Sequence, residues 1–533
     1  MKAKSLGGSA VALATIGIIA KLIGALYRVP LTNIVGAEGM GLYQMVFPLY
    51  TVLLAFCGGG AVSAVSRVVA KYTARGNNAA ALATVRIALV PLAVVSAVSA
   101  FCLALFRNLI SGIQGNTDAA IAYLAISPSL LFAGGISVLR GYFQGKSNML
   151  PSGISQLIEQ VIKLFLGLSL GRALMKYGVR YAVCGALVGV SSGELFALAY
   201  LAIGFFVSRR KRRVRLERAC LAENAQDVVI VTDREILKEL YSFALPVTLG
   251  SLVLPVTQMI DSALVINLLM YGGVMRAEAT AQFGLFVGPV GTLLSMPSVV
   301  VVSVSVAFLP ALTAAVERAD GSAERITREV AQWIMLFVIP VALVFMIFPE
   351  QVCGALYRRG LSQAQLETAA MLLRVQAVSV FYAGVLQVCT TTLQGHNKAH
   401  KPVINLVIGA CVKVGLTPVL VRAFGIIGAA GAQAACYAVA ATLTARSAYK
   451  TAGIGADVKK ALILPLAASI AACGVFAGVY AILGFTALSV LWKTVIGGAV
   501  MLAVYSACAV AFGAFPLRKL FRIKKRENSS KMG

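Results

Sequence analysis

Charged side chains inside long apolar stretches are the residues of this sequence that could do chemistry. The basic ones are Lys21, Arg28, Lys163, Arg374 and Lys413, and the acidic ones are Glu159, Glu194 and Asp261. Near the middle of a bilayer each such charge costs about 2.5–3.5 kcal/mol, so these side chains must face one another or a wet cavity. Because basic residues outnumber acidic ones, the set favours an anion as the ligand.

Spacing gives individual residues a more specific interpretation. Lys21 and Arg28 are seven positions apart and share one helical face, and no acid stands at matching spacing in the same stretch. We therefore predict that both contact an anionic group, together with Lys163 and Lys413. Glu159 and Lys163 are four positions apart, which fits either an internal ion pair or a functional surface.

The acids Glu194 and Asp261 have two interpretations that the sequence does not separate. As single acids in apolar stretches, they can couple transport to a proton or a sodium ion, and Glu159 shares this role. They can equally pair internally with Lys21, Lys163 or Lys413. Arg374 stands near the end of its stretch, where a long side chain can reach the membrane surface.

The elements that carry these charges are membrane-spanning helices. Of the 533 residues, 59% are hydrophobic and 13% are charged, whereas soluble domains have roughly 45–50% and 25%. Apolar runs of about 20 residues recur along the chain, each long enough to cross the bilayer as a helix. We predict an all-α integral membrane protein with about fourteen transmembrane helices, the fifth over residues 152–174.

Basic residues fix the predicted orientation. The net charge of +27 is concentrated in short connections, above all in the run from Arg209 to Arg218 and in the C-terminal tail. The positive-inside rule then places both termini in the cytoplasm of a multi-pass protein, and it makes a nucleic-acid partner unnecessary. His396 and His400 have no nearby carboxylate, so we expect no metal site, no cofactor and no catalytic residues.

An internal repeat divides the chain. Gln144-Gly145 is followed 19 residues after the glutamine by Lys163, and Gln394-Gly395 is followed at the same spacing by Lys413. Parallel repeats are typical of transporters that hold their site between two halves. The predicted parts are an N-lobe of six helices (1–207), a basic cytoplasmic linker (208–240), a C-lobe of six helices (241–450), two further helices (451–516) and a basic cytoplasmic tail (517–533).

Several motifs resemble those of the polysaccharide-transport and stage V sporulation protein B group, which belongs to the multidrug/oligosaccharidyl-lipid/polysaccharide exporter superfamily and is related to lipid II flippases. The resemblance covers residues 5–450. The motifs are Lys21 to Pro30, Gly36 to Gln44 with Pro48, Gly141 to Gly145 with Pro151, Gln156, Glu159 and Gln160, and the segment from Met296-Pro297 to Leu309-Pro310.

The resemblance implies two six-helix lobes in a V around a central cavity, with two extra helices. It implies a flippase of the bacterial cell membrane that moves an undecaprenyl-pyrophosphate-linked saccharide, a precursor of peptidoglycan or polysaccharide, by alternating access. Lys21 falls where lipid II flippases carry a cationic cavity residue, and Arg28 lies within one position of another. The expected partners are this lipid-linked saccharide and membrane lipids, and we favour a monomer.

Three other functions remain open from the sequence. A multidrug or small-molecule exporter could use the same scaffold, although cationic drugs would favour acids in the cavity. A membrane glycosyl ligase or polymerase would need acid and base groups in a sizeable outer loop. A scaffold protein without transport activity is excluded by no residue.

Overall fold

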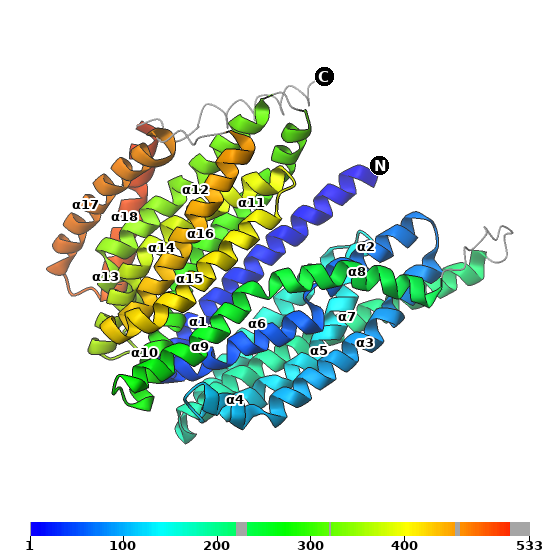
Figure 1. Ribbon diagram of the computed structural model, residues 1–533, viewed down its shortest axis with the longest axis horizontal. Coiled ribbons are helices and arrows are strands. Elements are labelled where there is room, and N and C mark those ends of the chain that lie inside the picture. The colour runs from blue at the N-terminus through cyan, green and yellow to red at the C-terminus, as the bar shows by residue number, and fades with distance from the viewer. Residues whose placement is uncertain (1, 220–231, 319–320, 454–458, 512–533) are drawn as a thin grey trace. The chain divides into compact units, whose positions relative to one another are not determined.

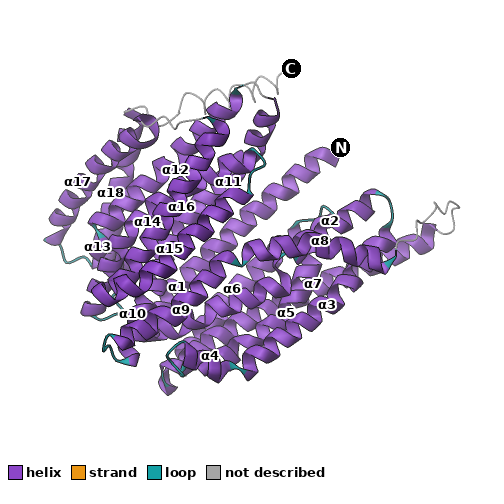
Figure 2. Ribbon diagram, in the orientation of Figure 1, coloured by secondary structure: helices purple, strands orange, loops and turns teal. Residues whose placement is uncertain are grey.

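The computed structural model describes residues 2–219, 232–318, 321–453 and 459–511, and the regular elements in these ranges are helices (Figures 1 and 2). The chain divides into two compact units, residues 1–288 and 289–533. The predicted all-α membrane fold is confirmed.

The described residues of the first unit form ten α-helices, blue to green in Figure 1. They are α1 (Lys2–Leu54), α2 (Ala61–Ala74), α3 (Asn78–Leu105), α4 (Arg107–Ile113), α5 (Ala119–Gly145), α6 (Leu150–Leu174), α7 (Val179–Ala219), α8 (Asp233–Ser251), α9 (Val253–Tyr271) and α10 (Arg276–Leu285). Among the described residues of the second unit, the α-helices are α11 (Gly291–Arg318), α12 (Ser322–Ile347), α13 (Pro349–Tyr357), α14 (Gln363–Gly395), α15 (His400–Phe424), α16 (Ile426–Ala452), α17 (Leu464–Gly484) and α18 (Val490–Ala511).

Helix α1 consists of two limbs that meet at Gly36. This residue has φ 68° and ψ −170°, which interrupts the helix. A side chain would clash with the backbone in this conformation, so glycine is the residue that permits the break. The two limbs correspond to the first two predicted spans.

The helical segments that are long enough to span a membrane match the predicted spans in number. Twelve segments of the described chain are long and apolar enough to cross a membrane, and the first, Thr15–Ala74, includes the break at Gly36. Helix α6 is less apolar because Gln156, Glu159, Gln160 and Lys163 lie on it, but its 25 residues are long enough to span. The twelve segments, with the first divided at Gly36 and α6 added, correspond to the fourteen predicted spans.

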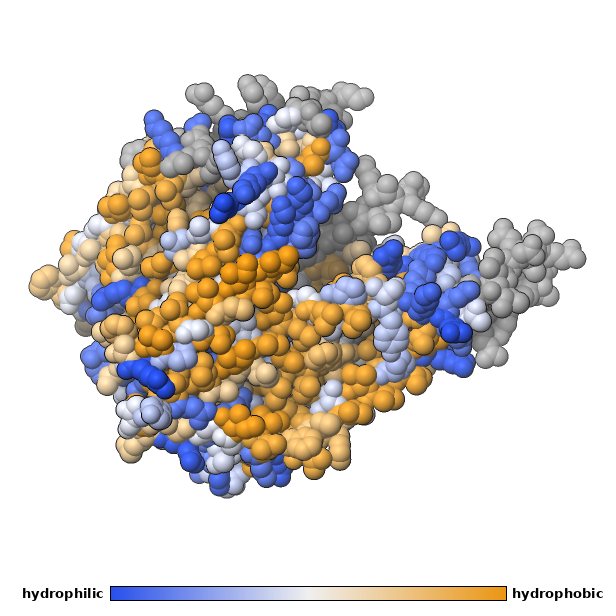
Figure 3. Space-filling model, viewed as in Figure 1, coloured by the Kyte–Doolittle hydropathy of each residue, from blue (hydrophilic) through white to orange (hydrophobic). Residues whose placement is uncertain are grey.

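The helix surfaces are apolar where they face outward. Figure 3 shows hydrophobic residues over most of the visible helices and hydrophilic residues gathered near the helix ends. Large apolar side chains such as Phe101, Phe165 and Leu502 are exposed. A surface of this kind is stable against lipid chains and would aggregate in water.

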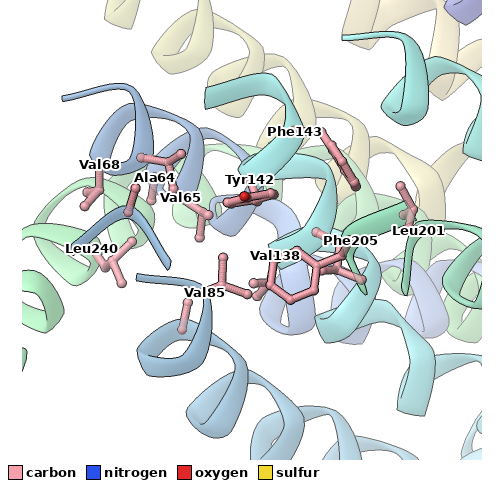
Figure 4. Close-up of a cluster of buried hydrophobic side chains, with 14 of the residues drawn as sticks. Ala64, Val65, Val68, Val85, Val138, Tyr142, Phe143, Leu201, Phe205 and Leu240 are labelled. Atoms are coloured by element: carbon pink, nitrogen blue, oxygen red, sulfur yellow. The ribbon is translucent and has the colours of Figure 1, made fainter. Parts of the chain in front are cut away.

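The first unit has a core in which five helices meet. Val65 and Val68 from α2, Val138 and Tyr142 from α5, and Phe205 from α7 pack together with residues of α3 and α8 (Figure 4). The Tyr142 and Phe205 rings meet edge to face with centroids 5.1 Å apart. This packing fixes α5 and α7, which carry two of the functional side chains described below.

Helices α17 and α18 are anchored within the second unit. The Tyr505 hydroxyl of α18 donates a hydrogen bond to the Leu336 carbonyl of α12 at 2.6 Å. The ring of Phe476 on α17 lies 4.5 Å from that of Phe348, centroid to centroid. The two helices that follow the repeat therefore pack against α12 and the start of α13.

The predicted linker, residues 208–240, is helical over much of its described part. Helix α7 continues to Ala219, and α8 begins at Asp233. Arginine, which occupies six of the positions from 209 to 219, has high helix propensity, so the helix continues through this basic run. The predicted lobe boundaries remain a prediction, as does the tail at 517–533, which lies outside the described residues along with 220–231.

The internal repeat has a structural counterpart. After α5, the amide of Ser147 donates to the Gln144 carbonyl and the amide of Asn148 donates to the Phe143 carbonyl. After α14, the amides of the two equivalent positions donate in the same pattern to Gln394 and Leu393. Ser147 and Asn397 both have φ 58°, the left-handed conformation of a Schellman helix end. Both predicted repeat motifs therefore end a helix in the same way.

Candidate anion site in the first unit

Lys21 and Arg28 lie on a polar stripe of α1 that faces α6. The stripe also contains Gly17 and Gly24, and the spacing of four, three and four residues keeps all four on one side of the helix. A Cβ atom at Gly24 would lie 2.7 Å from Oε1 of Gln160 on α6, so the stripe approaches α6 closely. Lys21 is exposed and Arg28 is half-buried, about 10 Å apart along the axis.

Lys163 of α6 lies between the two limbs of α1. Its ammonium is 4.9 Å from the ring centroid of Tyr27 on the first limb and 5.6 Å from that of Phe47 on the second. Tyr27 is fully buried, and its hydroxyl donates to the Ala186 carbonyl of α7 at 3.5 Å. Aromatic faces attract a cation, so the two rings favour the position of the Lys163 ammonium between the limbs.

Lys21, Arg28 and Lys163, here called the cationic site, share one property. Within the part of the chain that the structure describes, none has a carboxylate oxygen within 4.0 Å. Arg28 and Lys163 are close enough for their like charges to interact. Cations inside membrane helices without acidic partners favour an anion as their ligand, and the contact of these three residues with such a ligand remains a prediction.

Glu159 pairs with Arg140 and not with Lys163. Nη2 of Arg140 on α5 lies 3.1 Å from Oε2 of Glu159, and its Nε donates to Ser155 Oγ at 2.9 Å. Gln160 donates to the other carboxylate oxygen of Glu159 at 3.1 Å. Glu159 therefore forms an internal ion pair, but its partner is an arginine on a neighbouring helix. Among the described residues, Lys163 has no ion pair.

Arg140 is a residue of this site that the sequence analysis missed. Helix α5 continues to Gly145, so Arg140 is inside the helix and its side chain is only 16% exposed. The signal that could have located it is the glycine and the polar residues at 145–148, which mark where the helix ends. Tyr27, Phe47 and Tyr50 were missed because aromatic residues in apolar stretches normally pack in cores.

Glu194 is buried beside Glu159 because α6 and α7 pack closely. A Cβ atom at Gly193 would lie 2.6 Å from the backbone oxygen of Glu159, and one at Gly189 would lie 2.3 Å from the Cα atom of Gly167. The Tyr50 hydroxyl of α1 donates a hydrogen bond to Oε1 of Glu194. Internal hydrogen bonding is therefore present, and an additional role in ion coupling remains a prediction.

The other two predicted site residues are Asp261 and Lys413. Asp261 is buried on α9 of the first unit. Lys413 is buried on α15 of the second unit, where its ammonium donates to the side-chain oxygen of Gln433 on α16. Lys413 thus has a polar partner where Lys163 has aromatic rings. Its predicted contact with an anionic ligand remains a prediction.

Comparison with known sequences identifies the family. Residues 6–316 match the family model described as polysaccharide biosynthesis protein. The stage V sporulation protein B of Bacillus subtilis (strain 168) is 28% identical over 454 residues, which cover 83% of each chain. The lipid II flippase MurJ of the same organism is 24% identical over 435 residues, covering 79% of this chain and 78% of its own.

Solved structures show the same fold. A lipid II flippase MurJ in an inward closed conformation has a TM-score of 0.70 at 12% identity, covering 96% of this chain and 100% of its own. An inward-facing multidrug resistance transporter of the MATE family has a TM-score of 0.63 at 15% identity, covering 81% and 94%. These relatives are named as flippases and transporters and not as enzymes, which agrees with the prediction. Since the family model covers more than half of its length, the chain belongs to the polysaccharide biosynthesis protein family.

Proposed function

We propose that this protein is a flippase that moves an undecaprenyl-pyrophosphate-linked saccharide from the inner to the outer leaflet by alternating access. The observation that carries the proposal is the cationic site: Lys21, Arg28 and Lys163 present positive charge inside membrane helices without a carboxylate partner among the described residues. A pyrophosphate that links a lipid to a sugar carries two negative charges and fits this site chemically. Stage V sporulation protein B and lipid II flippase, the names of two relatives, support the same assignment.

The membrane potential can supply the energy for such a reaction. At about 100 mV, inside negative, each negative charge carried outward gains roughly 2.3 kcal/mol. With both termini in the cytoplasm of a bacterial cell, as the basic residues predict, the head group moves in the direction that the potential favours. Export then requires no nucleotide.

A multidrug exporter is the second candidate, favoured by the structural likeness to a MATE transporter. Cationic drugs need an acidic or aromatic site. Glu159 is engaged by Arg140, and Glu194 accepts from Tyr50. The cationic site has no ion pair among the residues that the structure describes. The charge at the site therefore supports an anionic substrate over a cationic one.

Replacing Lys21 tests the proposed function. We expect Lys21→Ala to abolish growth complementation in a bacterial strain depleted of its own lipid II flippase, because a cation that contacts the head group is lost. Lys176→Ala removes an exposed lysine in the short turn that follows α6, and it serves as the matched control. Both variants are measured at equal membrane expression. Full complementation by Lys21→Ala would contradict a role of Lys21 in the anion site.

A further inference from the structure

Glu194 is a buried acid whose two carboxylate oxygens have different surroundings. The residue is only 6% exposed. Its Oε1 accepts the Tyr50 hydroxyl, whereas its Oε2 is buried with no hydrogen-bond partner among the residues that the structure describes. A carboxylate with an unsatisfied buried oxygen is costly to keep ionised, so nearby charges decide whether it holds a proton.

Charged and titratable groups surround Glu194 on every element that packs against it. The groups that interact electrostatically with its carboxylate are Tyr50 on the second limb of α1, Cys57 in the π-helical turn that follows, Arg140 on α5, and Glu159 and Lys163 on α6. Arg28 adds its charge through its interaction with Lys163. The acid and the cationic site therefore belong to one electrostatic cluster.

An anion bound at the cationic site adds negative charge beside the Glu194 carboxyl. Arg28, Arg140 and Lys163 supply three positive charges, and Glu159 supplies one negative charge. The linkage between lipid and sugar in the proposed substrate adds two negative charges to this cluster. Repulsion between this anion and an ionised Glu194 is unfavourable in a low dielectric, so a bound anion favours the protonated form of Glu194.

We propose that Glu194 is a proton-binding site whose protonation is coupled to the binding of the anionic head group. The proton passes from water to the free Oε2 when the pyrophosphate occupies the cationic site, and it returns to water when the head group leaves. No covalent bond other than this O–H bond forms or breaks. The inference rests on the proposed function, because the anion is taken to be the pyrophosphate of a lipid-linked saccharide.

Two aromatic side chains connect Lys163, where the anion is proposed to bind, with Glu194, where the proton is proposed to bind. Phe47, one of the rings beneath the Lys163 ammonium, meets the Tyr50 ring edge to face with centroids 5.7 Å apart. Tyr50 in turn donates to Glu194. An anion that draws Lys163 toward itself weakens the electrostatic stabilisation of ionised Glu194, and proton uptake follows. By reciprocity, protonation of Glu194 strengthens anion binding.

The direction of the pH dependence follows from this linkage. If binding takes up one proton, the affinity for the head group rises as the pH falls, by at most about tenfold per pH unit. The ligand itself does not titrate in this range, because each of its phosphates has a single, strongly acidic oxygen. The measured dependence therefore reports on the protein.

The test measures the dissociation constant of undecaprenyl-pyrophosphate-linked N-acetylglucosamine with the full-length protein in detergent, from about pH 6 to about pH 8. We expect binding by the natural protein to weaken by about tenfold or more across this range. Glu194→Gln imitates the protonated acid, so it is expected to bind at the upper pH as tightly as the natural protein does at the lower pH. Glu194→Asp retains a carboxyl and is expected to restore a pH dependence.

Glu278→Gln is the matched control. Glu278 is exposed in the first turn of α10, and its replacement is expected to leave the pH dependence of the natural protein unchanged. Tight binding with no pH dependence in the natural protein, or an unchanged dependence in folded Glu194→Gln, would overturn the coupling while leaving the flippase proposal intact. Failure of the natural protein to bind this lipid at any pH would overturn the proposed function and the coupling with it.

Discussion

The Lys163 ammonium lies against two aromatic rings of the first unit, and no carboxylate oxygen of the described residues lies within 4.0 Å of it. Contacts of a cation with an aromatic face contribute about 0.5–2 kcal/mol, less than the cost of removing the ammonium from water. The remaining cost can be offset by a negatively charged ligand. Lys413, the repeat partner of Lys163, donates instead to Gln433, so the two equivalent lysines have different local surroundings.

Replacement of Lys163 is the most informative change at the residue scale. We expect Lys163→Ala to weaken binding of the lipid-linked pyrophosphate by about 10- to 100-fold, since a hydrogen bond to a charged group contributes about 1.5–3 kcal/mol. Lys163→Arg preserves the charge and should retain most of the affinity. The measurement is equilibrium binding in detergent, with Lys176→Ala as control. Equal affinities for Lys163→Ala and the natural protein would remove Lys163 from the site.

At the scale of helices, the approach of α6 to α7 positions the acids next to the cations. The two helices touch at Gly167 and Gly189, where a Cβ atom on Gly189 would lie 2.3 Å from the Cα atom of Gly167. Glycines at such contacts allow two membrane helices to pack backbone to backbone. Glu159 and Glu194 are neighbours in space for this reason.

A methyl group at this contact should therefore be harmful. We expect Gly189→Ala to destabilise the protein by about 1–3 kcal/mol, the usual cost of overpacking, and to lower its melting temperature in detergent. Gly474→Ala on α17 is the control, because a Cβ atom there meets no other atom within 4 Å. The melting temperature is followed by size-exclusion chromatography after heating. Equal stability of both variants would show that the helices have room to separate.

Much of the helix arrangement could be predicted from the sequence, and the pairing of side chains could not. Apolar runs locate the helices because a bilayer requires about 20 apolar residues per span. The repeat located Lys163 and Lys413 at equivalent helix positions. Helical spacing placed Glu159 and Lys163 on one face, but the partner of Glu159 is Arg140 on α5. Spacing within one helix carries no information about a neighbouring helix, so Arg140 and Tyr50 became visible only in three dimensions.

At the scale of the whole molecule, orientation in the membrane decides the direction of transport. The basic residues concentrate after α7 and at the C-terminal end, and the positive-inside rule predicts that such segments lie in the cytoplasm. An even number of spans is required if both termini are on the same side. The fourteen helices inferred from the sequence and matched by the structure satisfy this condition.

Reporter fusions test the orientation. We expect an alkaline phosphatase reporter to be inactive, and a green fluorescent protein reporter to be fluorescent, when fused after residue 533 or inserted at 225. A reporter at residue 116, between α4 and α5, should show the opposite behaviour. Active phosphatase at position 225 would contradict the predicted topology.

The most direct test is lipid translocation by the purified protein in liposomes. A fluorescent, undecaprenyl-pyrophosphate-linked saccharide is placed in both leaflets, and its arrival in the outer leaflet is followed with a membrane-impermeant quencher under an imposed potential. We predict translocation well above that of protein-free vesicles, lost in Lys163→Ala and retained in Lys176→Ala. Folded natural protein that moves this lipid no faster than empty vesicles would contradict the account.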